Sequence, residues 1–189
     1  MALGDPYGTV TELKTRLRIG DTDDDDALTQ ALAAASGGAE LFCDRQFNRA
    51  ATASARSFPA LGASLLLVDD FHTVTGLVID GTAYSSTVHR LEPRNGIVGG
   101  QPGWPYWRVR LATGIWTSDE VEVTAVWGWA SVPTGVTEAV LQTAMEIFKM
   151  KDAPFGIQGA ADLGLIRIRD NMRVTQMLTP YRRHAAAVA

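Results

Sequence analysis

The sequence predicts an α+β fold, in which a helical core is interrupted by a small antiparallel β-region. Apolar residues recur at helical spacing near both ends of the chain, whereas between Ala50 and Trp129 they alternate or form short runs. The composition, 46% hydrophobic and 20% charged, is that of a globular protein. We therefore expect a single domain of 189 residues, divided into N-terminal helices (1–49), a β-insertion (50–130), a core helix (131–152) and a C-terminal segment (153–189).

The first helix is predicted by a capping box. Thr9 stands at the N-cap and Glu12 three residues later, so each side chain can bond the other residue's backbone N–H. The helix is expected to run to about Arg18, with Gly20 as its stop. The aspartates that follow, Asp21 and 23–26, lack the glycine and distal glutamate of a calcium loop. We interpret them as acids that favour the N-terminus of the next helix.

The second helix is predicted from Asp25 to Asp44. Its apolar residues lie on one face of a helix: Leu28, Leu32, Ala35, Ala39 and Phe42. Gly37 and Gly38 interrupt it, and a glycine inside a helix costs about 1 kcal/mol relative to alanine. The pair predicts either a kink or a close approach of another backbone.

The middle of the chain predicts five or six short strands. The clearest are Ser64–Val68, Val74–Ile79, Tyr106–Ala112 and Val121–Trp127. Asp80-Gly81 is typical of a two-residue hairpin turn, and Asn95-Gly96 is a second turn candidate. After the Trp127-Gly128-Trp129 corner, a third helix is expected from Pro133 or Thr134, since proline suits a first helical turn.

A short last helix is predicted from Asp170 to Leu178, ended by Pro180. The residues expected to form the structural core are those on the apolar faces and at the Trp-Gly-Trp corner. They are Leu28, Leu32, Phe42, Phe47, Trp127, Trp129, Pro133, Val140 and Phe148.

Catalytic chemistry has little support in the sequence. Asp69, Asp70 and His72 resemble metal ligands, with His89 as a fourth, but a solvated turn explains them better. Cys43 is expected to be a buried, inert thiol. The chain has no P-loop, nucleophile elbow, His-Glu-x-x-His or paired-cysteine motif. We therefore predict no catalytic residue, no metal and no cofactor; a metal-dependent enzyme using Asp70 and His72 is the weakest hypothesis.

All the tryptophans fall in or beside the β-region. Buried packing is the commoner role of such rings. The alternative function is a small β-rich binding module that uses Trp104, Trp107 or Trp116 on a glycan or peptide.

Charge is unevenly distributed. The net charge is −4, yet residues 165–189 hold five arginines and one aspartate, so this segment carries +4 and the rest −8. A basic tail on an acidic body favours docking onto an acidic partner, although a solvated tail is an equal alternative. The single cysteine and the absence of a visible signal peptide or membrane span favour synthesis in a reducing cytoplasm.

Three stretches give the chain a family resemblance. The first is LKTRLRIG, then an acidic helix start and an alanine-rich helix ending in CDRQF. The second is the strand-to-helix corner from Val123 to Trp129 with Val132-Pro133. The third is the chain end, with Met177-Leu178 and Pro180-Tyr181-Arg182-Arg183. In this order they resemble the head–tail connector (adaptor) proteins of tailed phages.

The resemblance implies a structural virion protein of the neck, not an enzyme. It implies a homo-oligomeric ring, commonly of twelve subunits, that lies under the portal protein and contacts the next neck (stopper) or tail protein. DNA would pass through the channel without specific binding, and no membrane is involved. The resemblance also assigns portal docking to Arg167, Arg169, Arg173, Tyr181, Arg182 and Arg183. Deleting residues 168–189 is then expected to leave the fold intact and abolish attachment to filled heads.

Overall fold

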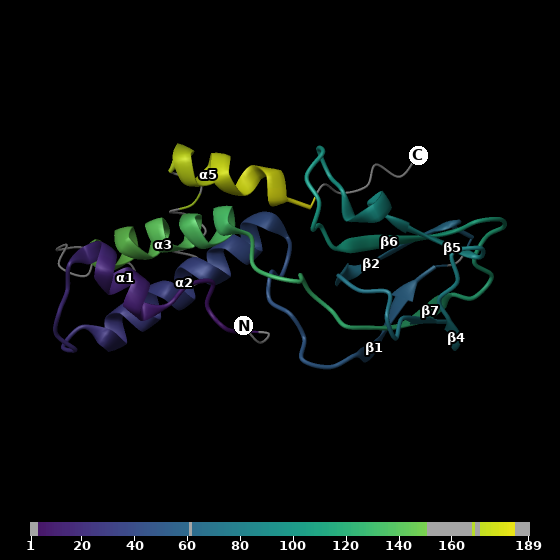
Figure 1. Cartoon of the computed structure of the whole chain (residues 1–189), viewed down its shortest axis with the longest axis horizontal. Coiled ribbons are helices and arrows are strands. Elements are labelled where there is room, and N and C mark those ends of the chain that lie inside the picture. Colours follow the sequence, from purple (N-terminus) through teal and green to yellow (C-terminus); the bar gives the residue numbers. More distant parts are fainter. Residues whose placement is uncertain (1–3, 61, 151–167, 169–170, 184–189) are drawn as a thin grey trace. The chain divides into compact units, whose positions relative to one another are not determined.

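The computed structural model describes residues 4–60, 62–150, 168 and 171–183 (Figure 1). It confirms an α+β protein with helices and small antiparallel sheets. The chain forms two compact units, each described separately below. The helical unit comprises the residues up to Phe47 and those from Val132 onward, and the β unit is Asn48–Ser131.

The helical unit contains α1 (Val10–Leu17), α2 (Asp25–Cys43), α3 (Thr134–Lys149) and α5 (Met172–Leu178), followed by a 3-10 turn at Thr179–Tyr181. Helix α2 packs along α3, and α5 packs on both. Fully buried side chains from all these helices form its core, among them Leu13, Leu28, Val140, Val174 and Leu178.

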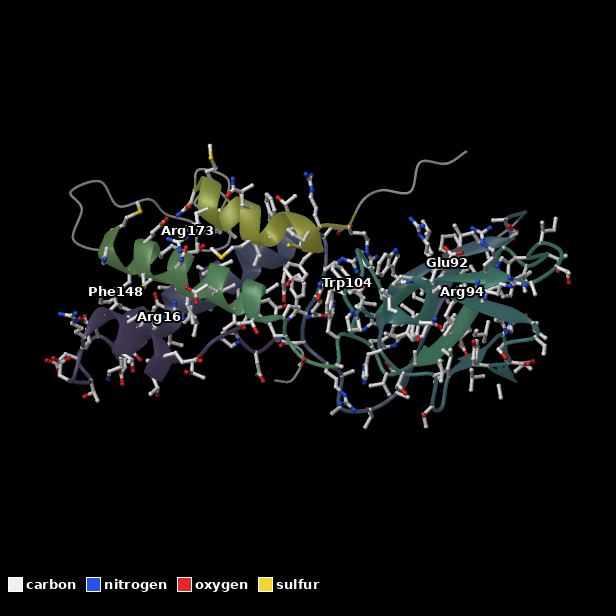
Figure 2. The ribbon with its side chains drawn as sticks, turned by 45° about the horizontal axis from the view of Figure 1, so that its top comes forward. Arg16, Glu92, Arg94, Trp104, Phe148 and Arg173 are labelled. Carbon is white, nitrogen blue, oxygen red and sulfur yellow. The ribbon has the colours of Figure 1, made fainter. Side chains whose placement is uncertain are left out.

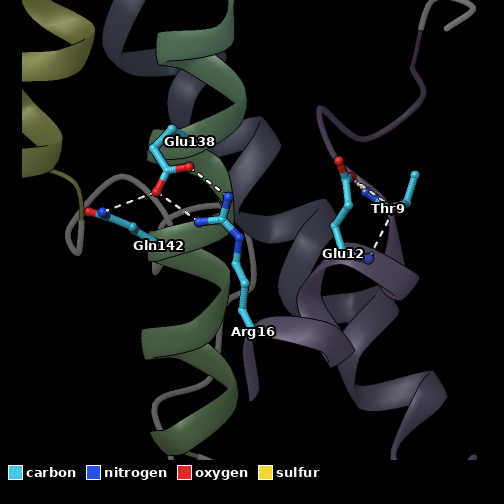
Figure 3. A network of polar contacts seen from close by, with 5 residues as sticks. All are labelled: Thr9, Glu12, Arg16, Glu138 and Gln142. Carbon is cyan, nitrogen blue, oxygen red and sulfur yellow. Dashed lines mark hydrogen bonds and ion pairs between the residues drawn. The ribbon is translucent and has the colours of Figure 1, made fainter. Parts of the chain in front are cut away.

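The predicted start of α1 is confirmed. Thr9 Oγ1 accepts the backbone N–H of Glu12, and the Glu12 carboxylate accepts the backbone N–H of Thr9 at 2.8 Å (Figure 3). The helix ends before Gly20, because Arg18 adopts the left-handed conformation (φ 59°) and donates its N–H to the last turn.

Helix α2 runs through Gly37 and Gly38 without a break, so the expected kink is absent. A Cβ added at Gly37 would meet nothing within 4 Å, so no close backbone approach explains that glycine either. Ala34, Ala35 and Ala39 around the pair are buried. Burial of this alanine face in the unit's core offsets the low helix propensity of the glycines.

The β unit contains two antiparallel sheets. One has the order β1-β7-β3-β4, formed by β1 (Ser54–Pro59), β7 (Glu120–Ala125), β3 (Val78–Ile79) and β4 (Thr82–Ala83). The other has the order β2-β6-β5, formed by β2 (Leu65–Phe71), β6 (Tyr106–Leu111) and β5 (His89–Glu92). Apolar side chains from both sheets form one buried cluster that includes Leu66, Phe71, Val109, Val123 and Trp127.

Both predicted turns are confirmed. Asp80 and Gly81 have positive φ (49° and 71°) and join β3 to β4, and Asn95-Gly96 also has positive φ (60° and 62°). Strands β1 and β5 were not among the clearest predictions, and only the end of Val74–Ile79 is a strand. Alternate residues of β1 are exposed, so its sequence lacks an apolar run.

The predicted core residues are mostly buried. Leu28, Leu32, Phe47, Trp127, Trp129, Val140 and Phe148 are at most 9% exposed. Phe42 and Pro133 are only half-buried. Pro133 instead serves as the N-cap residue of α3 in extended conformation.

Candidate functional site

Helix α5, which carries Arg173 and leads into the other described docking residues, Tyr181, Arg182 and Arg183, is anchored in the helical unit. Val174 and Leu178 are fully buried, as is Ile168 ahead of them. Asn171 caps the helix, because its Oδ1 accepts the backbone N–H groups of Arg173 (3.0 Å) and Val174 (3.2 Å). The exposed side chains of α5 therefore project from a helix whose backbone is held in place by its buried face and its cap.

An aromatic cluster holds the turn that follows α5. The Tyr181 ring meets Phe47 edge-on at 6.0 Å between centroids, and Phe47 meets Tyr7 in the same way at 5.6 Å. Tyr181 also covers Gly135, where an added Cβ would lie 3.3 Å from the ring. Tyr7 donates its hydroxyl to Glu40 and accepts the Phe47 N–H at 3.0 Å. Burial raises the pKa of both Tyr7 and Tyr181, so both stay neutral.

The predicted docking arginines differ in their surroundings. Arg173 and Arg182 are exposed, and the Arg182 guanidinium lies 5.7 Å from the centre of the Phe42 ring. Arg183 is half-buried and its backbone N–H bonds the Cys43 carbonyl at 2.7 Å. Arg167 and Arg169 lie outside the described residues. The structure thus brings Tyr181, Arg182 and Arg183 together beside the C-terminal end of α2.

A second polar network joins α1 to α3 (Figure 3). Arg16 donates two hydrogen bonds to the Glu138 carboxylate, at 2.6 and 2.7 Å, and Gln142 bonds the same carboxylate. The hydrogen bond from Arg16 lowers the pKa of Glu138, and Arg173 lowers it further by its charge. Figure 2 shows Arg16 and Arg173 on this unit.

The anchoring of α5 overturns one expectation from the sequence. Deleting residues 168–189 would remove Ile168, Val174 and Leu178, all fully buried, together with the Tyr181 ring. Losing a buried aliphatic side chain costs about 2–5 kcal/mol. The deletion would therefore damage the helical unit, and substitution of exposed side chains is the cleaner way to test docking.

Three of the four residues considered as metal ligands, Asp69, Asp70 and His89, have other contacts. Asp69 pairs with Arg56 at 2.5 Å, and Asp70 accepts the indole N–H of Trp129 at 3.0 Å. His89 is buried between the rings of Tyr84 and Trp116. Among the described residues no group of three or more His, Cys, Asp or Glu side chains could hold a metal ion. Cys43 is buried, and burial raises its thiol pKa to about 12.

The tryptophans pack mainly inside the β unit. Trp116 is 7% exposed and stacks on His89, so the hypothesis that it is an exposed binding ring is wrong. Trp104 packs against Trp129 with centroids 5.1 Å apart and against Trp107 at 6.2 Å. Trp104 and Trp107 keep part of their surface exposed.

The Trp-Gly-Trp corner is a packed junction within the β unit. The indole N–H of Trp127 bonds the Ser54 carbonyl at 2.9 Å. Gly128 has φ 96° and donates its N–H to the Asp70 carbonyl at 2.6 Å. A Cβ at Gly128 would lie 1.8 Å from the Asn48 carbonyl oxygen, so only glycine fits there.

Comparisons with known proteins agree with these features. Residues 7–67 match the family model described as phage gp6-like head-tail connector protein. The fold is similar to a chain in the neck of an empty GTA particle computed with C6 symmetry, at TM-score 0.55 and 20% identity, covering 95% of this chain and 91% of that one. A chain in the neck of a native GTA particle computed with C12 symmetry matches over the same shares at TM-score 0.47 and 16% identity. No curated protein matches the chain.

The helices and the inserted sheets thus form a fold similar to that of a chain in the neck of an empty GTA particle. Residues 7–67 match the model of the phage gp6-like head–tail connector family, which agrees with the resemblance inferred from the sequence. Neither the family nor the neck structures are described as enzymes. No helix among the described residues is long and apolar enough to cross a membrane.

Proposed function

We propose that this chain is a structural neck protein that links the head of a virus-like particle to its tail. One observation carries the proposal: the connector family match at residues 7–67 lies within a fold that resembles a neck protein over 95% of the chain. The same proposal places the protein in the virion neck as a ring under the portal, around the DNA channel. We take twelve subunits as the ring size implied by the family resemblance.

The C-terminal segment is the proposed contact with the portal. Arg173 is exposed on α5, whose Val174 and Leu178 are buried in the helical unit, and Arg182 is exposed just after the 3-10 turn that follows α5. Because the backbone that carries these arginines is already ordered, pairing with carboxylates adds no cost of backbone ordering, and each arginine can bind a carboxylate with two parallel hydrogen bonds. An acidic portal surface is therefore the partner that this segment fits. Tyr181 and Arg183, and Arg167 and Arg169 in the preceding segment, belong to the same proposed contact.

The acidic remainder of the chain suits a channel that DNA must slide through. Outside residues 165–189 the net charge is −8. Like charge between the channel wall and the phosphates disfavours specific DNA binding. The stopper or tail protein would bind the opposite end of the ring.

The test is electron microscopy of the protein mixed with purified portal or DNA-filled heads. A ring at the portal vertex is the expected result, and labelling absent from that vertex would contradict the proposal.

Docking is tested with Arg182→Glu, which should abolish attachment, against the matched control Lys149→Glu at an exposed position of the same unit. If both variants still decorate filled heads, the C-terminal segment is not the portal contact. Circular dichroism of each variant confirms that the helices remain folded.

A further inference from the structure

The β2-β6-β5 sheet carries a basic groove along β5 and β6. Leu91 on β5 and Val109 on β6 lie opposite each other and are buried. Their neighbours along the two strands are exposed or half-exposed: Arg90, Glu92, Arg108 and Arg110. The groove has a volume of about 810 Å³ and is lined by Arg90, Glu92, Arg94, Trp107, Arg108 and Arg110, among others. We call it the arginine groove. Figure 2 shows Glu92 and Arg94 beside each other in the β unit.

The charges in the arginine groove are not balanced internally. The strand register places Arg90 directly opposite Arg110 and Glu92 opposite Arg108. Glu92 accepts a hydrogen bond from Arg110 at 3.1 Å and lies 3.9 Å from the Arg108 guanidinium. Four arginines against one glutamate leave a net charge of +3. Like charges directly opposite on paired strands are destabilising, which an added anion would relieve.

An unsatisfied donor lies in the same groove. The Nε of Arg108 is buried and finds no acceptor among the described residues. A buried donor without a partner is costly, and an arriving carboxylate would satisfy it. The groove thus provides the exposed Arg90 and Arg94 and a buried N–H for a peptide bearing acidic side chains.

Carboxylates suit this groove better than a phosphate backbone. The Glu92 carboxylate stands among the arginines and repels evenly spaced phosphates. Acidic side chains on a peptide can instead lie on either side of Glu92, next to Arg90 and Arg94.

The chain itself carries an acidic segment of this kind, the run Asp21 and 23–26, which we call the acidic run. Asp25 pairs with Lys14 at 2.6 Å, whereas Asp21, Asp23 and Asp26 are exposed. The arginine groove and the acidic run are different surfaces of one chain. A contact between different surfaces of identical copies is heterologous, and such contacts repeat around a ring.

We propose that the arginine groove of one copy binds the acidic run of a neighbouring copy. This inference rests on the proposed ring and identifies its subunit contact. Its failure would leave portal-vertex labelling unaffected, so the two can be distinguished.

The first experiment measures binding of a fluorescein-labelled peptide of residues 19–30, IGDTDDDDALTQ, to the whole protein by anisotropy. The variant with Arg90→Ser and Arg94→Ser should bind about tenfold more weakly, and raising the salt about tenfold should also weaken binding. The control Arg49→Ser, at an exposed arginine of the β unit outside the groove, should bind like the unaltered protein. A peptide with asparagine at the aspartate positions should not bind. Equal binding to all variants, or of the asparagine peptide, overturns the proposal.

The second experiment separates a neighbouring copy from other occupants. The groove variant and a variant with Asp23→Asn and Asp26→Asn should each stay monomeric in sedimentation velocity, because each lacks one half of the contact. Their mixture should form a one-to-one complex, because the acidic run of the groove variant can bind the intact arginine groove of the aspartate variant. A mixture that stays monomeric at concentrations where the peptide binds shows that the acidic run of the folded chain does not enter the arginine groove of another copy, and overturns the proposal. A DNA duplex that binds the groove where the peptide does not also overturns it.

Discussion

Replacing Gly128 by alanine is the sharpest test of how the Trp-Gly-Trp corner is built. Gly128 has φ 96°, and an added Cβ would lie 1.8 Å from the Asn48 carbonyl oxygen and 3.0 Å from the Arg49 Cα. Both neighbours are backbone atoms, so they cannot move aside by a change of rotamer. The corner must open, which endangers the bonds from Gly128 to the Asp70 carbonyl and from Ala50 to the Trp127 carbonyl.

The magnitude follows from two contributions. The left-handed backbone costs an alanine about 1–2 kcal/mol. Loss of the two backbone hydrogen bonds adds about 1 kcal/mol each, or more if the groups stay buried. We therefore expect Gly128→Ala to lower the free energy of unfolding of the β unit by about 3–5 kcal/mol.

Gly114→Ala is the matched control. Gly114 has φ 83° in the same unit, but a Cβ there would meet nothing within 4 Å. This variant should lose only about 1–2 kcal/mol, the backbone contribution alone. The difference between the two variants measures the close approach at the corner.

Urea unfolding followed by tryptophan emission is the assay. All the tryptophans, residues 104, 107, 116, 127 and 129, lie within the β unit, so emission reports on that unit. If Gly128→Ala shifts the unfolding midpoint no further than Gly114→Ala, the close approach of Asn48 does not exist and the reasoning fails.

Three further predictions follow from the structure. Asn171→Ala should destabilise the helical unit by about 1 kcal/mol in thermal circular dichroism through loss of the α5 cap, while Asn171→Ser keeps most of it; equal losses would contradict this. Leu178→Ala should cost about 2–5 kcal/mol by the same measurement, whereas Met172→Ala, at a 75% exposed position, should cost almost nothing. Burial lowers the pKa of both His89 and His72 below the ordinary 6.5, so the unfolded chain binds protons more readily; stability of the β unit should fall as pH drops from 7 through 6 and 5, and His89→Phe should remove part of that slope in urea titrations. A slope unchanged in His89→Phe would assign it to other groups.

Local features of this fold were predictable wherever a short-range rule controls them. The capping box at Thr9 and Glu12, the turn at Asp80-Gly81 and the start of α3 after Pro133 each depend on neighbours along the chain. Features that depend on residues far away in the chain were not predictable from the sequence. Strand β1 is recognised only through its pairing with β7, and α2 continues through its glycines as one helix because it packs on α3.

The charged surfaces can likewise be separated into one that the sequence predicted and one that only the folded structure creates. The composition of the C-terminal segment made its arginines candidates for docking, but burial of Ile168, Val174 and Leu178 showed that the segment is also part of the helical core. The arginine groove had no local signature, because Arg90 and Arg110 become neighbours only through the pairing of β5 with β6. Composition therefore identified the basic C-terminal segment, whereas the pairing of β5 with β6 created the arginine groove.

By itself the sequence determined the α+β class, the helix boundaries set by caps and the family resemblance at the N-terminal region. These follow from residue spacing and from contacts within a few positions, which the chain carries before it folds. The tertiary structure decided which side chains lie inside, why Gly128 admits no Cβ and where like charges meet on a sheet. Those properties arise when segments distant in the chain are brought within van der Waals or Coulombic range, and spacing along the sequence does not encode that proximity.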